Sequence, residues 1–246
     1  MFKLLSSAFG VFLVSLVVFA YVGEKNQDMI MTKLGNYFKA DGEDIQEFIR
    51  NMREGNYKHK FDESKYTSEE VSYFNEIVYD GIEDGKPVHT NFVDKYTEDV
   101  KIYMEGDQPS YIVEELDRIV NELNGIINPI EVYVVHDKSE ANLIVTIGSG
   151  DLVSQQYTVF QNFDNSRARG RVVFSEEGNY ANVMLNTDNI ETVTSAKHVL
   201  REEVTQALGL IHDSMTYPES IFYDGQCNVT EYAPIDRKLI DILYNN

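Results

Sequence analysis

The fold is decided by the stretch REEVTQALGLIHDS, Arg201 to Ser214. Residues four apart lie on one face of an α-helix, so Glu202 and Gln206 are expected to project side by side. His198, four residues before Glu202, extends the same stripe of polar side chains. Glu203 is displaced by about 100° around the helix axis, so its carboxyl group lies beside this stripe. The pattern predicts a helix with a polar constellation on one side.

The same stretch predicts where this helix ends. Gly209 follows the last turn, and glycine tolerates the positive φ that often follows a helix end. After that turn His212 can return toward the stripe of Glu202 and Gln206, and Asp213 follows it directly. We therefore expect a helix over about residues 191–208 and a site formed by its end and the next turn.

Strand and helix patterns alternate before this helix. Val100, Ile102 and Met104 alternate with polar residues, which is the period of a strand with one buried face. The run SYIVEELDRIVNELNG places its apolar residues on one helical face and stops at Gly125. Further strands are expected at IEVYVVHD, ANLIVTIG, RVVFS and YANVMLN, and a last short helix at PIDRKLIDILY. The predicted fold class is α+β, a mixed sheet with helices packed on it.

The spacing of these strands also predicts an edge of the sheet. Several strand candidates lie between the two main helices, and parallel neighbours require longer crossovers than these connections allow. At least one edge strand must therefore be antiparallel. An exposed edge strand of that kind is a place where an extended peptide could add itself.

The N-terminus predicts export. Within residues 1–23, Lys3 precedes the apolar run AFGVFLVSLVVFAYVG, and Ala20 is small enough to precede a signal-peptidase site. We expect a signal peptide, or an uncleaved anchor over residues 4–22. Either one places the rest of the chain on the secreted, periplasmic or cell-surface side of the membrane.

The remainder divides into two expected parts. Residues 24–94 form a polar N-terminal segment with short helices, and residues 95–246 form the main domain. Apolar residues at helical spacing in residues 69–82 predict a helix that packs on this domain.

The composition restricts the partners. The formal net charge of -20 at pH 7 argues against nucleic acid, because duplex binding draws its affinity from Lys and Arg. Cys227 is the only cysteine, which excludes an intramolecular disulfide or a thiolate cluster. A membrane contact is expected only through the N-terminal segment.

EEVTQALGLIHDS resembles the HExxHxxGxxH motif of the metzincin peptidases. The five motif positions are held here by Glu202, Glu203, Gln206, Gly209 and His212. The stretch also resembles a bacterial family of secreted proteins of unknown function, whose helix reads EExxQxxG followed by an aspartate. That second resemblance implies that the Glu and the Gln are a family pattern rather than random decay.

Two later segments extend the metzincin resemblance. SIFY, residues 220–223, is similar to the methionine turn, with Phe222 in the methionine place as a core residue beneath the helix. YAPIDRKLIDILY, residues 232–244, is similar to the closing helix of matrixin-type members. The resemblance implies a zincin-type fold over about residues 95–244, with an active-site-type helix and a C-terminal helical tail.

The departures from the motif leave three chemical interpretations open. Zinc prefers imidazole, thiolate and carboxylate, so Glu202, Gln206 and His212 do not predict a tight zinc site. A calcium or magnesium ion would find oxygens on Glu202, Gln206, Glu203 and Asp213, with His198 as an extra ligand, but these are fewer than calcium normally takes.

The other two interpretations need no metal. Glu202, Gln206 and His212 could form a buried hydrogen-bonded clasp between the helix and the tail. Alternatively, Glu203 could act as general base on a water held by Gln206, with His212 stabilising charge.

Three functions follow as expectations. The first is an exported, inactive or non-classical peptidase homologue that binds extended polypeptide or cell-envelope material, without a cofactor. The second is an active hydrolase that uses Glu203 with an atypical metal or none. The third is a structural envelope protein.

Overall fold

The computed structural model describes residues 59–83, 85–90, 93, 95–151, 153, 167–174, 180–225 and 228–245. These residues belong to one compact unit, spanning His59–Phe174 and Asn179–Asn246. The expected signal peptide or anchor and Cys227 lie outside the described residues. Among the helices that the structure does describe, none is long and apolar enough to span a bilayer.

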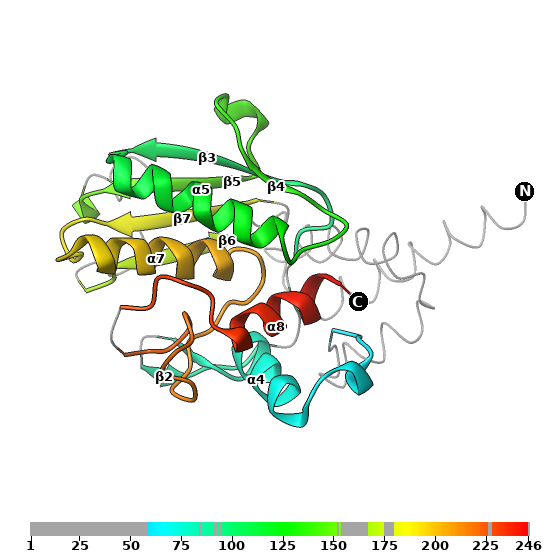
Figure 1. Cartoon of the computed structure of the whole chain (residues 1–246). Helices are drawn as coiled ribbons and strands as arrows, with labels where there is room; N and C mark the ends of the chain where they lie inside the picture. Colours follow the sequence, from blue (N-terminus) through cyan, green and yellow to red (C-terminus); the bar gives the residue numbers. More distant parts are fainter. Residues whose placement is uncertain are drawn as a thin grey trace, which may run out of the picture. The chain divides into compact units, whose positions relative to one another are not determined.

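The centre of the unit is a five-stranded mixed sheet in the order β4-β3-β5-β7-β6 (Figure 1). β3 is parallel to β4 and to β5, and β5 is parallel to β7. β6 pairs antiparallel with β7 and forms one edge of the described sheet, as the strand spacing predicted. The bounds are β3 Val100–Gly106, β4 Val132–Val134, β5 Leu143–Gly148, β6 Gly170–Phe174 and β7 Ala181–Asn186.

The strands differ in how far they are buried. β3 alternates between buried and less buried residues, as expected of a strand with one face on the core. β5 and β7 are buried at every position, which is typical of parallel strands covered on both faces. Met184 of β7 packs with Val153 and Val173 in a small cluster apart from the main core.

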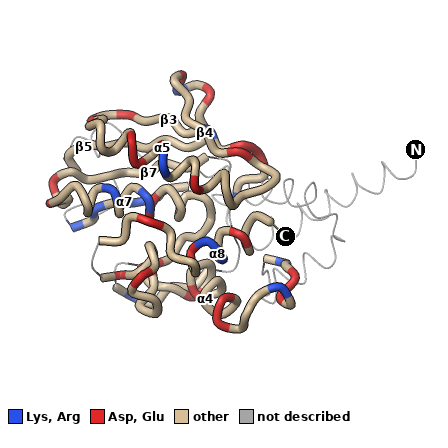
Figure 2. The backbone as a smooth tube through the Cα atoms, viewed as in Figure 1, with Lys and Arg blue, Asp and Glu red and all other residues tan. Residues whose placement is uncertain are grey.

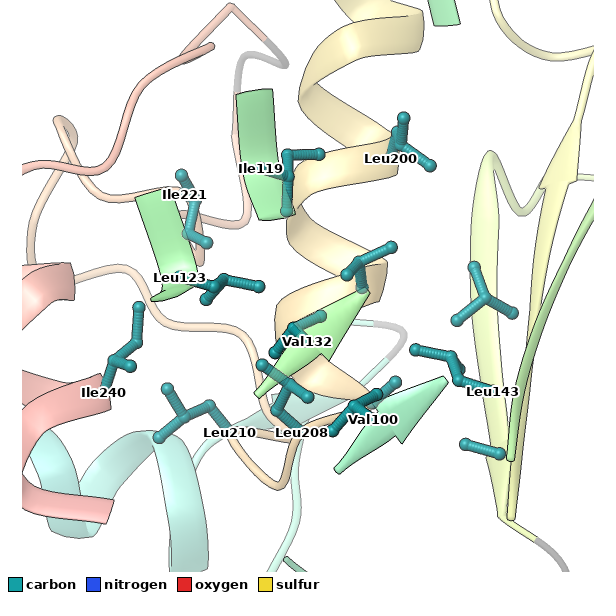
Figure 3. Close-up of a cluster of buried hydrophobic side chains, with 14 of the residues drawn as sticks. Val100, Ile119, Leu123, Val132, Leu143, Leu200, Leu208, Leu210, Ile221 and Ile240 are labelled. Carbon is teal, nitrogen blue, oxygen red and sulfur yellow. The ribbon is translucent and has the colours of Figure 1, made fainter. Parts of the chain in front are cut away.

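Two helices lie side by side along one face of the sheet, α5 Ser110–Asn124 and α7 Val193–Gln206 (Figure 1). α5 buries the apolar stripe that its sequence predicted, and its C-cap is Gly125. The Thr192 side chain caps α7 by accepting a hydrogen bond from the Ser195 amide. Figure 3 shows Leu200 of α7 near Ile119 of α5, with strand residues Val100, Val132 and Leu143 in the same cluster.

Two further helices, α4 Ser68–Tyr79 and α8 Pro234–Tyr244, pack against each other. α4 begins with a capping box between Thr67 and Glu70 and buries Phe74 and Ile77 in the main core. The predicted packing of this helix on the later domain is confirmed, although it precedes residue 95. The smaller elements are η2 Glu63–Lys65, β1 Ile82–Glu83, β2 Lys86–Pro87 and η3 Lys138–Glu140. The predicted class, α+β with a mixed sheet, a motif-bearing helix and a C-terminal helix, is confirmed.

A buried ion pair fixes α7 to α5. Arg201 Nη2 lies 2.6 Å from Glu115 Oε1, and both side chains are 0% exposed. The guanidinium group also lies 4.6 Å from the centre of the Tyr232 ring and 3.2 Å from a Glu122 carboxylate oxygen. Arg201 directly precedes the polar constellation of α7, so this pair sets the rotation of the helix that carries the site.

Candidate functional site

The site begins at the end of α7. Gly209 has a φ of 118° and donates its N–H to the Gln206 carbonyl, so the predicted turn with positive φ is confirmed. The chain after the turn is held by backbone hydrogen bonds. The His212 amide donates to Ile77, and Asp213 and Ile82 exchange hydrogen bonds of 2.9 and 3.1 Å. The tail is therefore anchored to the segment around α4 as well as to α7.

Glu203 lies against the edge strand. Its side chain is only 7% exposed, and a Cβ atom added to Gly170 of β6 would lie 2.2 Å from Glu203 Oε1. Within the described part of the chain, Oε2 has no hydrogen-bond partner. Burial raises the pKa of Glu203 well above its ordinary value, the nearby Asp213 raises this pKa further, and Arg171 lowers it. The environment thus favours a neutral carboxyl group beside the β6 backbone.

Gln206 joins the helix to the tail directly. Its Nε2 donates a 2.7 Å hydrogen bond to Asp213 Oδ1. A side-chain link between α7 and the tail is therefore present, and it pairs Gln206 with Asp213 rather than with His212.

Glu202 and His198 lie on one stripe, as the helical spacing predicted. His198 Nε2 is 3.5 Å from Glu202 Oε2, and His198 Nδ1 donates a 2.8 Å hydrogen bond to the Val229 carbonyl. His198 is 1% exposed, and burial lowers its pKa, with Arg169 acting in the same direction. Burial of the imidazole therefore favours its neutral form, while its Nε2 faces the Glu202 carboxylate.

His212 has different neighbours. It is buried, its Cβ lies against Gly81, and its electrostatic neighbours are Asp80 and His89. Burial lowers the pKa of His212. Across the residues that the structure places, its Nε2 has no hydrogen-bond partner.

A metal ion of the kind that the metzincin resemblance implies needs ligands that converge. The three motif side chains instead have separate neighbours: His198 for Glu202, Asp213 for Gln206, and the Asp80 region for His212. Among the described residues, no group of three His, Cys, Asp or Glu is placed to hold a metal. As placed, the motif residues do not fit a zinc ion.

The SIFY turn is a buried hydrogen-bonded structure. Phe222 is fully buried in the main core. Ser220 accepts a hydrogen bond from the Tyr73 hydroxyl and donates one of 2.6 Å to Asp236 Oδ1. Asp236 also accepts from the amides of Ile221 and Ala233. This carboxylate therefore ties the turn to the start of α8.

Sequence reasoning missed several of these residues. Gly170 and Arg171 belong to a strand that was predicted only as a strand, and their contact with Glu203 is long-range. The role of Asp236 had a local signal, since an acid at the third position of a helix often accepts from the preceding cap amide. The ion pair of Arg201 with Glu115 had no such signal.

The contact between Gly170 and Glu203 makes a testable prediction. Gly170→Ala is expected to lower the free energy of unfolding by about 1–3 kcal/mol, because the new Cβ overpacks the carboxyl group. In a Glu203→Ala background the same change should be nearly neutral. Urea unfolding of the four chains of this double-mutant cycle measures the difference. Equal effects in both backgrounds would show that the two residues are not in contact.

Comparison with known proteins places this fold and site in a family. No curated protein matches the chain. Two solved structures, titled "Structure of Myroilysin" and "Crystal structure of myroilysin", are distantly similar, each at 14% identity and a TM-score of 0.43. They cover 61% and 62% of this chain and 82% and 86% of their own. Residues 69–246, from α4 through the site to the C-terminus, match the family described as "Protein of unknown function (DUF2927)". The chain therefore belongs to the DUF2927 family of proteins of unknown function.

Proposed function

We propose that this protein is a non-catalytic, peptidase-like domain that binds an extended polypeptide along β6. The observation that carries the proposal is the position of this strand. β6 is antiparallel, lies at an edge of the described sheet, and packs on the helix that bears the peptidase-like motif. An extended chain can add to such an edge through backbone hydrogen bonds.

The register of β6 identifies the backbone groups that would bind. The Asn186 amide donates to the Arg169 carbonyl, so residue 169 is a hydrogen-bonded partner of β7. Hydrogen-bonded positions alternate along an antiparallel pair, and Val172 therefore directs its N–H and C=O away from β7. Val172 offers its backbone to a further strand.

Binding without cleavage is supported by the environment of Glu203. A general base must be ionised and within hydrogen-bond reach of the water that it activates. Glu203 is instead only 7% exposed, and its Oε1 lies against the Gly170 backbone. Gln206, which would hold the water, donates one of its two amide N–H groups to Asp213.

In this proposal, the polypeptide is bound outside the cytoplasm. This part of the proposal rests on the apolar N-terminal run, which supports export as a secreted or envelope protein.

The test measures how tightly the whole chain binds unstructured decapeptides from a library. Val172→Pro removes the outward N–H of β6 and should weaken peptide binding about tenfold, the loss expected for one good backbone hydrogen bond. Val172→Ala is the matched control, because it shortens the same side chain but keeps the N–H. Fluorescence anisotropy of labelled peptides measures both.

The same library separates the alternatives. Wild type and Glu203→Gln are expected to bind peptides equally and to release no fragments, as judged by mass spectrometry. Cleavage that disappears in Glu203→Gln would overturn the proposal in favour of a hydrolase. Absence of any binding would favour a structural envelope protein.

A further inference from the structure

A pocket of about 270 Å³ lies between α4 and the segment that follows Asp213. Its walls include Glu69, Tyr73 and Glu76 of α4, and Thr216 and Tyr217 opposite them. It is separate from the residues of the peptidase-like motif. We propose that this α4 pocket binds a basic side chain, Lys or Arg, of the extended polypeptide, an inference that rests on the proposed function.

The charged side chains among the described lining residues of the pocket are all acidic. Glu69 and Glu76 contribute two carboxylates to the lining, and no Lys, Arg or His is among the described residues that line the pocket. Among the described residues, neither carboxylate forms an ion pair with a Lys or Arg. Acidic residues lie along α4, which carries no Lys or Arg (Figure 2). A cation that enters the pocket meets two carboxylates that no Lys or Arg of the described residues has neutralised.

The Glu76 carboxylate is held in place before any ligand arrives. Ser214 Oγ donates a 2.6 Å hydrogen bond to Glu76 Oε1, and Thr216 Oγ1 lies 2.9 Å from Oε2. These hydroxyl groups orient the carboxylate without cancelling its charge. A preorganised acceptor loses less conformational freedom when it binds.

The half-buried Tyr217 ring, with the buried Tyr73 ring behind it, suits the rest of a basic side chain. The Tyr73 and Tyr217 rings meet edge to face, with centroids 4.7 Å apart. The Tyr73 hydroxyl is bonded to Ser220, which fixes that ring. Lys and Arg place their aliphatic stems on apolar surface and their charged ends over aromatic faces or beside carboxylates.

One short segment connects this pocket to the end of α7. Asp213 accepts the hydrogen bond of Gln206, and the next residue, Ser214, holds Glu76. Asp213 and Ser214 are consecutive, so one residue hydrogen-bonds to the motif helix and the next to the pocket. The inference therefore places one basic side chain of the polypeptide bound along β6 in this pocket.

The test uses a small probe that needs no strand addition. Nα-acetyl-arginine methylamide is titrated into the ¹⁵N-labelled full chain, with chemical shifts followed by NMR. The citrulline derivative, which has the same shape without the charge, is the ligand control. We expect the arginine probe to shift the amides of residues 68–76 and 214–217, with affinity reduced at least fivefold by Glu69→Gln and by Tyr217→Ala.

The net charge of -20 could attract any cation, so a matched variant is needed. Glu114→Gln on α5 removes the same charge from an exposed site and should leave the affinity unchanged. Equal binding of the citrulline probe, or equal weakening by Glu114→Gln, would overturn the inference. Urea unfolding of each variant confirms that it folds.

These experiments can reject the pocket and the proposed function independently of each other. Val172→Pro should not change binding of the arginine probe, because the probe makes no strand. Library peptides that bind without a preference for Lys or Arg, together with no binding of the probe, would reject the pocket and leave peptide binding intact. Probe binding without any peptide binding would support the pocket as a cation site and reject the proposed function.

Discussion

Replacing Glu115 by leucine is expected to lower the free energy of unfolding by about 3–5 kcal/mol, because it leaves a fully buried guanidinium group without its main partner. Arg201 is 0% exposed, and two of its nitrogens bond to Glu115 Oε1 at 2.6 and 3.2 Å. Glu122 remains 3.2 Å away and is itself partly exposed, so it compensates only in part. Urea unfolding at pH 7 measures the loss.

Two further chains show whether the loss comes from the unpaired charge. Arg201→Met combined with Glu115→Leu removes both charges, and this double variant should be more stable than the Glu115→Leu chain. Glu114→Leu alters the exposed neighbour on the same helix and should change stability by no more than about 0.5 kcal/mol. If the double variant were as unstable as Glu115→Leu alone, lost packing rather than an unpaired charge would be the cause.

Some features of the fold could be predicted from the sequence alone. Local periodicity was sufficient for β3 and for α5 up to Gly125, and the turn at Gly209 after α7 followed from the glycine itself. The antiparallel edge followed from connection lengths. In each of these cases, the determining residues are neighbours along the chain.

Features that depend on distant partners could not be predicted in this way. Glu115 and Arg201 are separated by 86 positions, and nothing in either local pattern names the other. His212 was expected to return toward Glu202 and Gln206, but the backbone bond of its amide to Ile77 places it in the environment of Asp80 and His89. Residue types in a motif show which chemistry is available, while tertiary contacts decide which of those side chains meet.

Asp236→Ala is expected to destabilise the protein by about 3 kcal/mol, because three buried donors lose their acceptor. These donors are the Ser220 hydroxyl and the amides of Ile221 and Ala233. Lys238→Ala, at an exposed position of the same helix, is the control and should have little effect. Thermal and urea unfolding at pH 7 compare the three chains.

The same carboxyl group predicts a dependence on pH whose sign is opposite to that of most carboxylates. Burial raises the pKa of Asp236 from 3.8 to about 6, so the folded state binds this proton more tightly than the unfolded state does. The cost of the buried charge is therefore fully present above about pH 6 and disappears as the pH falls toward 4. At about 1.4 kcal/mol per unit, wild type should gain about 2.4 kcal/mol relative to Asp236→Asn between pH 7 and pH 4. Urea unfolding of both chains across this range gives the difference, in which groups common to both cancel. A wild type that instead loses stability relative to Asp236→Asn on acidification would show that the hydrogen bonds from Ser220 and the two amides outweigh burial.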